Sequence, residues 1–311
     1  MLSRRAYPRQ ALYGPIVSTD NTIGANPKNV TLVSIESVSF QENRDTIKVH
    51  TMMTATQNTV TVPESTSDIL CRIASTRKER EAAFRLVYNS YLQAGLGEMN
   101  DYKMRVTPYH LSDCSEIFIA TRRGKVIFTM TLIMDGEELG VPMESVYGDE
   151  VDRLRRRGLR LGEVSCLADC QRHVREFFPI FLWTSRLMVQ YARYRGLDAL
   201  VAAVHPKHAR FYRRFMDFRT FGLEKTYPTV RNHPAVALWL EFVRIDRELP
   251  PQYEFFFGEQ IPYSELQPHP ISEEDGECFR PMIDLNFQCA PLGDTDDYEQ
   301  QREDEALVYV G

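Results

Sequence analysis

The chain has 311 residues, 43% of them hydrophobic, and a formal net charge of -6. This length allows one large domain or two small ones, and the hydrophobic content is sufficient for a folded core. The acidic balance argues against a nucleic-acid-binding protein, because such proteins usually show a basic excess or a dominant basic face. No run approaches the roughly 18 apolar residues that a membrane span requires, so we expect no integral membrane segment.

The cysteines do not form paired Cys-x-x-Cys motifs. Six are present: Cys71, Cys114, Cys166, Cys170, Cys278 and Cys289. No apolar secretory leader precedes them, so the pattern favours reduced thiols over a disulfide framework. We therefore expect a cytoplasmic protein.

Residues 1–66 are expected to form an N-terminal arm. About the first 28 residues are rich in Pro, Gly, Asn and Ser and show no periodicity. Thr- and Val-rich runs at 30–35 and 46–53 are candidate strands, but they lack a long apolar face. Partial disorder and peripheral strands both remain open for this arm.

The main domain is predicted to span residues 67–247. Thr76 and Glu79 have the spacing of a capping box, in which their side chains satisfy backbone N–H groups at a helix start. Gly95 supplies a stop signal. Between these signals apolar side chains recur with helical spacing at Phe84, Val87, Tyr88 and Tyr91, which predicts an amphipathic helix.

Two β runs follow at 116–121 and 125–134. The short turn that joins them contains Arg123 and Gly124, which predicts an antiparallel hairpin. A helix is predicted at 142–157, where it ends in a basic run.

The stretch at 160–218 is the centre of the predicted domain. A strand at 161–168 and a polar connection at 169–175 precede a helix at 179–195. A strand at 199–204 and a short helix ending at 218 follow. Strand, helix and strand in this order predict a right-handed crossover between neighbouring parallel strands. Glu163 is the charged residue in the otherwise apolar first strand, so we expect a carboxylate where the two strands diverge.

Two further strands are predicted at 225–230 and 235–243. Composition changes after Arg247, and residues 248–311 are expected to form a C-terminal extension. Its Pro- and aromatic-rich part, 250–291, is expected to pack on the domain. Its acidic run at 294–305 is interpreted as a solvated tail.

Several motifs occur in this order along the chain: Arg72-Ile-Ala-Ser-Thr-Arg-Lys-Glu79, Pro142-Met143, Glu163-Val-Ser-Cys-Leu-Ala168, His205-Pro-x-His-Ala-x-Phe-Tyr-Arg-Arg214, Tyr227-Pro-x-Val and Pro234-Ala-Val-Ala-Leu238. Their order and spacing resemble the N-acyl amino acid synthase (FeeM-type) family of GNAT-fold acyltransferases, related in fold to the acyl-homoserine lactone synthases. The resemblance covers about residues 69–243. It implies an α/β fold with a mixed α+β sheet.

The resemblance also implies the reaction. A medium- or long-chain acyl group would move from an acyl carrier protein to the α-amino group of an amino acid. The acyl-phosphopantetheine thioester would be a co-substrate, with no bound cofactor. Residues 169–175 contain no glycine, so the usual Gly-rich pyrophosphate loop is missing, which fits a carrier-bound donor better than acetyl-CoA. Cys166 stands where homoserine lactone synthases carry an arginine, which argues against S-adenosylmethionine as acceptor.

Glu163 is the candidate general base, because an amino acid arrives as an ammonium ion and must lose a proton before it attacks. Partial burial would raise the pKa of this carboxyl towards a useful range. The alternative is a structural glutamate paired with an arginine. The resemblance places the oxyanion hole in backbone N–H groups near Ser165, Cys166 and Leu167.

The resemblance makes Tyr212 the candidate acid for the leaving thiol, because GNAT relatives often place such an acid one turn into this helix, and the alternative is simple packing beside Phe211 and Phe215. A nucleophilic role for Cys166 is rejected, because no histidine partner is indicated and a strand cysteine is more often a small buried residue. His205 and His208 lack further metal ligands, so no metal is expected and a place beside the pantetheine arm is favoured.

Two basic runs stand out against the acidic background: Arg153 to Arg160, and the group Lys207, Arg210, Arg213, Arg214 and Arg219. Carrier proteins are acidic, so the second run, which flanks the expected thioester site, is the better docking candidate. Ordinary solvated faces are the alternative for both runs. Ala168 and Arg172 are assigned to the same pantetheine and carrier-binding group.

The resemblance implies that the connection after the first helix helps to build the acceptor site, which makes Arg105 the candidate cation for the acceptor carboxylate, with a solvated arginine as the alternative. Tyr109 lies in the same acceptor region and is equally compatible with packing. Two other functions stay open. One is an acyl-homoserine lactone-like or CoA-dependent N-acyltransferase, and the other is a non-catalytic acyl-carrier or lipid-binding protein.

Overall fold

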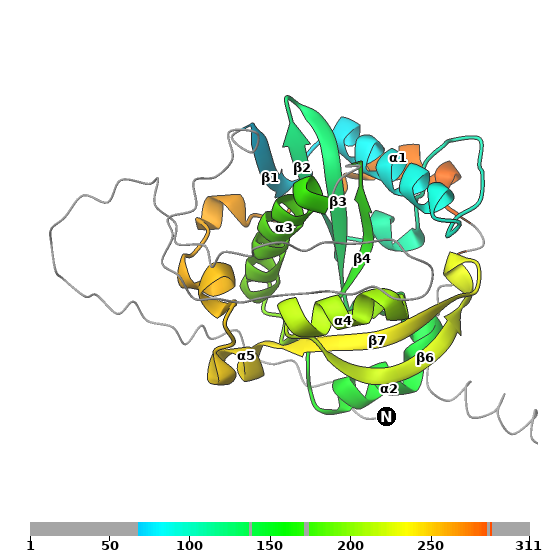
Figure 1. The fold of residues 1–311 in the computed structure, drawn as a ribbon. Helices are drawn as coiled ribbons and strands as arrows, with labels where there is room; N and C mark the ends of the chain where they lie inside the picture. Colours follow the sequence, from blue (N-terminus) through cyan, green and yellow to red (C-terminus); the bar gives the residue numbers. More distant parts are fainter. Residues whose placement is uncertain (1–67, 137–138, 171–173, 285–286, 288–311) are drawn as a thin grey trace, which may run out of the picture. The chain divides into compact units, whose positions relative to one another are not determined.

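Seven strands form one mixed sheet in the part of the chain that the structure describes, in the order β1-β2-β3-β4-β5-β7-β6 (Figure 1). The structure is a computed structural model that describes residues 68–136, 139–170, 174–284 and 287. The predictions for the N-terminal arm, for Arg172 and for the acidic tail lie outside these residues. The strands are β1 (Ile69–Ile73), β2 (Ser115–Arg122), β3 (Lys125–Met134), β4 (Leu161–Asp169), β5 (Ala199–Val204), β6 (Arg219–Tyr227) and β7 (His233–Glu241).

Helices cover both faces of this sheet. They are α1 (Arg77–Gln93), α2 (Glu144–Arg156), α3 (Val174–Tyr194), α4 (Pro206–Phe215), α5 (Phe242–Glu248) and α6 (Glu273–Phe279). Strand residues alternate between the two faces: Phe118 of β2 packs in the cluster that contains α3, whereas Ile117 and Ile119 pack in the cluster that contains α1. One face therefore carries α1 and α2, and the other carries α3 and α4.

The local signals in the sequence are confirmed where they are strong. Thr76 and Glu79 form the expected capping box at the start of α1. Arg123 and Gly124 both have positive φ, at 52° and 75°, as a two-residue hairpin turn between β2 and β3 requires. The strands β4 and β5 pair in parallel, as the predicted crossover required.

Three predicted boundaries are wrong, and proline lies at two of them. The strand predicted at 225–230 ends at Tyr227, because Pro228–Val230 forms a 3-10 helix. The same strand begins at Arg219, six residues earlier than predicted, and its register shifts near Gly222 hide the alternation of a strand. The helix predicted from Pro179 begins at Val174, so this proline lies inside α3.

The C-terminal extension packs on the domain as predicted. Phe256, Leu266 and Phe279 are all buried. Beyond α5 the chain passes α3 and returns to α1, where Asp275 of α6 forms ion pairs with Arg77 and Arg80. The extension therefore contacts the sheet face that carries α3 and also the face that carries α1.

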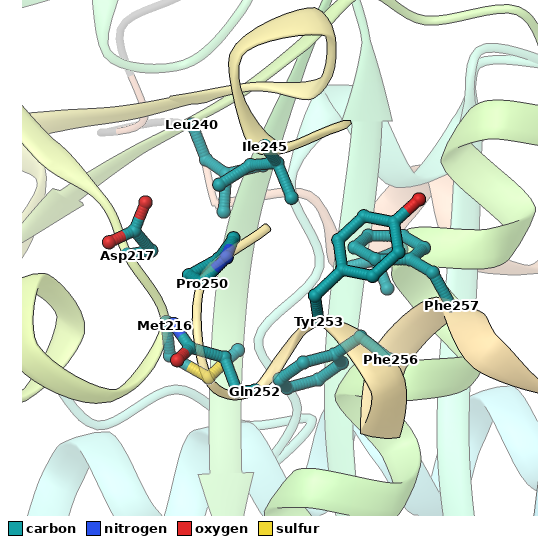
Figure 2. A pocket seen from close by; sticks show the side chains of 10 residues that line it. Met216, Asp217, Leu240, Ile245, Pro250, Gln252, Tyr253, Phe256 and Phe257 are labelled. Atoms are coloured by element: carbon teal, nitrogen blue, oxygen red, sulfur yellow. The ribbon is translucent and has the colours of Figure 1, made fainter. Parts of the chain in front are cut away.

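An apolar pocket lies where the extension covers β7. Figure 2 shows Leu240 and Ile245 facing the aromatic side chains of Tyr253 and Phe256. The Asp217 carboxylate at its edge pairs with Arg244 at 2.5 Å. Because this charge is already neutralised, we interpret the pocket as a packing seam rather than a site of chemistry.

Candidate active site

A gap opens inside the sheet at Glu163. The ladder between β4 and β5 runs from Leu161–Ala199 to Glu163–Val201 and goes no further. Both strands continue beyond this point, each paired on its outer side with β3 or β7. The carboxylate thus lies where the parallel strands diverge, which confirms its predicted location.

A β-bulge follows directly on β4. Ser165 pairs with Thr131 and Ala168 pairs with Thr129, so Cys166 and Leu167 together oppose a single residue, Met130. Cys166 has a φ of 51°, which is uncommon for a residue with a side chain and costs of order 1–2 kcal/mol. The bulge takes backbone groups out of the ladder in the segment where the oxyanion hole is predicted.

Glu163 is a buried carboxyl, 2% exposed, on the face of the sheet that α2 covers. Its Oε2 accepts a hydrogen bond of 2.7 Å from the backbone N–H of Met143, which begins α2. Burial raises the pKa of Glu163 to about 8, although the Met143 hydrogen bond opposes this rise and the charge of Glu144 adds to it.

The proposed arginine partner of Glu163 is absent. No salt bridge to this carboxylate occurs within the described residues, and the nearby Arg155 pairs instead with Asp135, Glu144 and Asp152. The interpretation of Glu163 as an arginine-paired structural residue is therefore wrong for the described part of the chain. What remains is an unpaired buried carboxyl next to a gap in the sheet.

Tyrosines surround this carboxyl. Burial and then the charge of Glu163 raise the pKa of Tyr227 well above its ordinary value. Burial also raises the pKa of Tyr91, to which Cys166, Arg105, Tyr212 and Glu163 contribute smaller electrostatic effects. These mutual effects indicate that the side chains from α1, β4, α4 and the end of β6 lie near one another, and Tyr91 packs in the same cluster as Cys166.

Two of these tyrosines were not predicted as site residues. Tyr91 belongs to the apolar stripe of α1, and its hydroxyl is not distinguishable from packing by spacing. Tyr227 was noted within the Tyr-Pro motif, and that motif is the signal that could have identified it. Tyr109, which was predicted, is 2% exposed and lies edge-on to Phe287 at 5.9 Å.

Arg105 is buried, not solvated. It is 7% exposed, its Nη2 donates to the carbonyl oxygen of Thr229 at 3.0 Å, and its Nη1 lies 3.3 Å from Asp284. Its guanidinium lies 5.1 Å from the ring centre of Tyr91. The solvated alternative is wrong because this side chain is buried against Tyr91, Thr229 and Asp284 rather than exposed to water.

Tyr212 reaches the site from α4, on the opposite face of the sheet from α1. Its ring packs edge-on against Phe181 and Phe218, so the packing alternative describes part of its role. Burial raises the pKa of its hydroxyl to about 12, and this hydroxyl forms no hydrogen bond within the described residues. A protonated and unengaged hydroxyl beside the gap is compatible with the predicted acid.

Cys166 has the properties of a buried small residue. Burial raises the pKa of its thiol, although the charge of Arg105 and the Ser165 hydroxyl, 3.8 Å away, act in the opposite direction. A raised pKa disfavours the thiolate that nucleophilic catalysis needs. Ala168 is likewise buried, against Val87 of α1, while Ser165 and Leu167 are half-buried.

The start of α4 holds the two histidines. His205 is the N-cap residue, and its Nδ1 accepts a hydrogen bond from the backbone N–H of Lys207. His208 follows one turn later, with the two ring centres 6.1 Å apart. No group of three or more His, Cys, Asp or Glu residues that could hold a metal ion occurs in the described ranges.

The two basic runs differ in whether their side chains form ion pairs. In the first run, Arg155, Arg157 and Arg160 form ion pairs with acidic neighbours. On α4 all four basic side chains are exposed, and none forms a salt bridge with another described residue: Lys207, Arg210, Arg213 and Arg214. The fifth member of that run, Arg219, pairs with Glu248. The surface of α4 therefore presents positive charge that no acidic side chain in the described part of the chain compensates.

Comparisons with known proteins bear on the family and the fold of this chain. A family model described as "N-acyl amino acid synthase FeeM" matches residues 82–241, more than half of the chain. The structure of FeeM, an N-acyl amino acid synthase from uncultured soil microbes, is 28% identical with a TM-score of 0.52, covering 62% of this chain and 99% of that one. A search of curated proteins found no match.

More distant structures have lower similarity. The acyl-homoserine lactone synthase LasI is 16% identical with a TM-score of 0.46, covering 62% of this chain and 96% of its own. An N-acetyltransferase from Staphylococcus aureus Mu50 is 11% identical with a TM-score of 0.37, covering 56% of this chain and 98% of its own. None of the helices that the structure describes is both long and apolar enough to cross a membrane.

Proposed function

We propose that this chain transfers a medium- or long-chain acyl group from an acyl carrier protein to the α-amino group of an amino acid. It belongs to the FeeM family of N-acyl amino acid synthases and is an acyltransferase with a GNAT-like mixed α/β fold. The observation that carries this proposal is Glu163, a buried carboxyl that has no ion-pair partner among the described residues and lies at the point where β4 and β5 separate.

The acceptor's ammonium first loses a proton to Glu163, directly or through a water molecule. A carboxyl pKa of about 8 suits this step, because it lies close to neutral pH and nearer to the pKa of an amine than that of an ordinary glutamate. The neutral amine then attacks the thioester carbonyl carbon, and a C–N bond forms as the carbonyl oxygen becomes an oxyanion. Backbone N–H groups near Ser165, Cys166 and Leu167 stabilise that charge.

Collapse of the tetrahedral intermediate breaks the C–S bond. Tyr212 donates a proton to the departing thiolate of the pantetheine arm, and the nitrogen of the new amide gives its second proton through water to the tyrosinate that this leaves. Release of the Glu163 proton to solvent completes the cycle. The open edges of β4 and β5 beyond Glu163 offer backbone groups along which the arm can lie. The arm is supplied with the substrate, so no bound cofactor takes part.

The donor is a carrier protein in this proposal because of α4. Lys207, Arg210, Arg213 and Arg214 carry exposed charge without acidic partners among the described residues. Positive side chains at an entrance steer an acidic protein into contact and make its docking sensitive to salt. His205 and His208 at the start of the same helix then lie beside the entering arm.

The test is mass spectrometry on the purified full-length chain. The protein is incubated with a pool of the twenty amino acids and acyl groups of several lengths, carried either by acyl carrier protein or by CoA. An N-acyl amino acid formed from the carrier, and lost in Glu163→Gln, supports the proposal. Product formed from acyl-CoA but not from the carrier protein would mean that the donor is acyl-CoA. Binding of the carrier protein without any product would favour a non-catalytic carrier-binding protein.

A further inference from the structure

The C-terminal extension reaches the segment that carries Arg105. Ile283 forms a parallel β-bridge with Val106, and the backbone N–H of Asp284 donates to the carbonyl oxygen of Val106 at 2.9 Å. These backbone contacts fix Asp284 beside the acceptor region. The carboxylate of Asp284 then lies 3.3 Å from Nη1 of Arg105.

The guanidinium of Arg105 is held on several sides. Asp284 contacts Nη1, and the carbonyl oxygen of Thr229 accepts from Nη2 at 3.0 Å. The rings of Tyr91 and Phe287 lie at 5.1 Å and 5.6 Å from its central carbon. Because partners at both terminal nitrogens fix its rotation, the direction of the N–H group on Nε is also fixed.

That Nε is buried and has no hydrogen-bond partner within the described residues. Four other arginines share this property, namely Arg122, Arg186, Arg193 and Arg244, so the free donor alone does not single out Arg105. Its position does, because the guanidinium lies 5.1 Å from the ring centre of Tyr91, which packs in the same cluster as Cys166 of β4. The free donor therefore belongs to the volume around the candidate active site.

A buried guanidinium with a free N–H edge is suited to a carboxylate, which arginine binds through parallel hydrogen bonds. The proposed reaction brings one such group, the α-carboxylate of the acceptor. We propose that Asp284 is a positioning residue of the acceptor site, which orients Arg105 so that its Nε edge binds the carboxylate of the amino acid. This inference rests on the proposed function. Asp284 also lies outside residues 82–241, so the site uses a part of the chain beyond the family match.

A competing role for Asp284 would have the opposite effect on acceptor binding. If its carboxylate only occupied Arg105 in place of the acceptor, its removal would strengthen binding of the acceptor carboxylate. The geometry favours positioning, because Asp284 contacts a terminal nitrogen of Arg105 and leaves Nε free.

The test compares each acceptor with the amine that lacks its carboxylate. The probes are phenylalanine with phenethylamine and leucine with 3-methylbutylamine, together with any acceptor found in the pool experiment and its amine. The measured quantity is the ratio of kcat/KM for the amino acid to kcat/KM for the amine. We expect wild-type protein to favour the amino acid, and Asp284→Ala to lower the ratio at least tenfold through the KM of the amino acid.

Asp284→Asn keeps an oxygen that can accept from Nη1, so it is expected to retain the ratio within about threefold. Arg105→Lys keeps the charge but loses the planar fork, and it is expected to lower the ratio as Asp284→Ala does. Glu277→Ala, an exposed acid of the same extension that pairs with Arg280, is the matched control and leaves the ratio unchanged. Thermal melting of every variant identifies loss of folding.

The outcomes separate the two proposals. No product from wild-type protein would refute the proposed function and this inference with it. Wild-type activity with an unchanged ratio in Asp284→Ala would leave the function intact and overturn the inference, because both acceptors would then lose rate together. A ratio that rises in Asp284→Ala would also overturn it, since Asp284 would then compete with the acceptor.

Discussion

Replacing Glu163 by Gln tests the state of the buried carboxyl by two independent measurements. Gln keeps an oxygen that can accept the Met143 N–H and has nearly the same size, so the change removes mainly the ability to ionise. As the general base, Glu163 should contribute roughly 10²–10⁴-fold to kcat/KM, and the variant should lose about that amount. In wild-type protein, kcat/KM should rise with pH and level off near pH 8. Measuring this profile with two acceptors of different amine pKa separates the enzyme's ionisation from theirs.

The second measurement is stability against pH, which does not depend on catalysis. The carboxyl pKa rises from 4.5 to about 8 on folding, so the unfolded chain loses this proton at lower pH than the folded protein. The folded state then binds more protons, and the contribution of Glu163 to the free energy of unfolding falls as pH rises from about 4.5 to 8. The proton-linked loss between pH 5.5 and pH 8 is about 3 kcal/mol.

Gln cannot ionise, so Glu163→Gln should escape this loss. Its Tm relative to wild type should increase by roughly 6–12 °C between pH 5.5 and pH 8. The assay is paired thermal melting in matched buffers. A constant difference in Tm across this range would refute the argument that Glu163 stays protonated in the folded protein. A variant that keeps full kcat/KM would refute the assignment of the base, whatever the melting curves show.

Three further predictions concern other parts of the molecule. Tyr212→Phe should lower kcat by roughly 10–100-fold without changing the KM of the acceptor, and a kcat within about twofold of wild type would leave packing as its only role. Charge reversal of Arg210 and Arg213 to Glu should raise the KM for the carrier protein about tenfold at low salt and less at high salt. The same change at Arg153 and Arg156, which are exposed on α2, should leave this KM unchanged. Equal effects of the two pairs would reject α4 as the docking surface. Phe279→Ala should lower the free energy of unfolding, measured by denaturant titration, by about 3–5 kcal/mol, because this side chain is fully buried against Phe84. The control Leu223→Ala, at a position that is 80% exposed, should have little effect. Similar losses in both variants would contradict the assigned packing.

Much of the fold was predictable because its signals lie in short stretches of neighbouring residues or in the periodicity of apolar residues. The capping box at Thr76 and the Arg123-Gly124 turn depend only on neighbouring residues, so the sequence carries them directly. The parallel pair of β4 and β5 follows from two apolar runs separated by one helix. A single charge in the first of these runs was enough to locate Glu163 at the divergence of the strands.

The remaining features depend on contacts between distant residues. The edge strand β6 is interrupted by register shifts near Gly222, and most of its residues are exposed, so its sequence lacks the alternation of a strand. The burial of Arg105 depends on Thr229 and Asp284, which lie more than a hundred residues further along the chain. No pattern around Arg105 itself could have shown these partners.

The packing of Phe279 against Phe84 also constrains how this protein can be made. The two rings meet edge-on at 5.1 Å, yet α1 is synthesised long before α6. At the usual rate of about 5–20 residues per second, the part of α1 around Phe84 stays without its Phe279 contact for roughly 10–40 s. During that interval α1 exposes surface that can bind a chaperone or another nascent chain. A fragment that stops at Arg247, where the composition changes, would keep that surface exposed permanently.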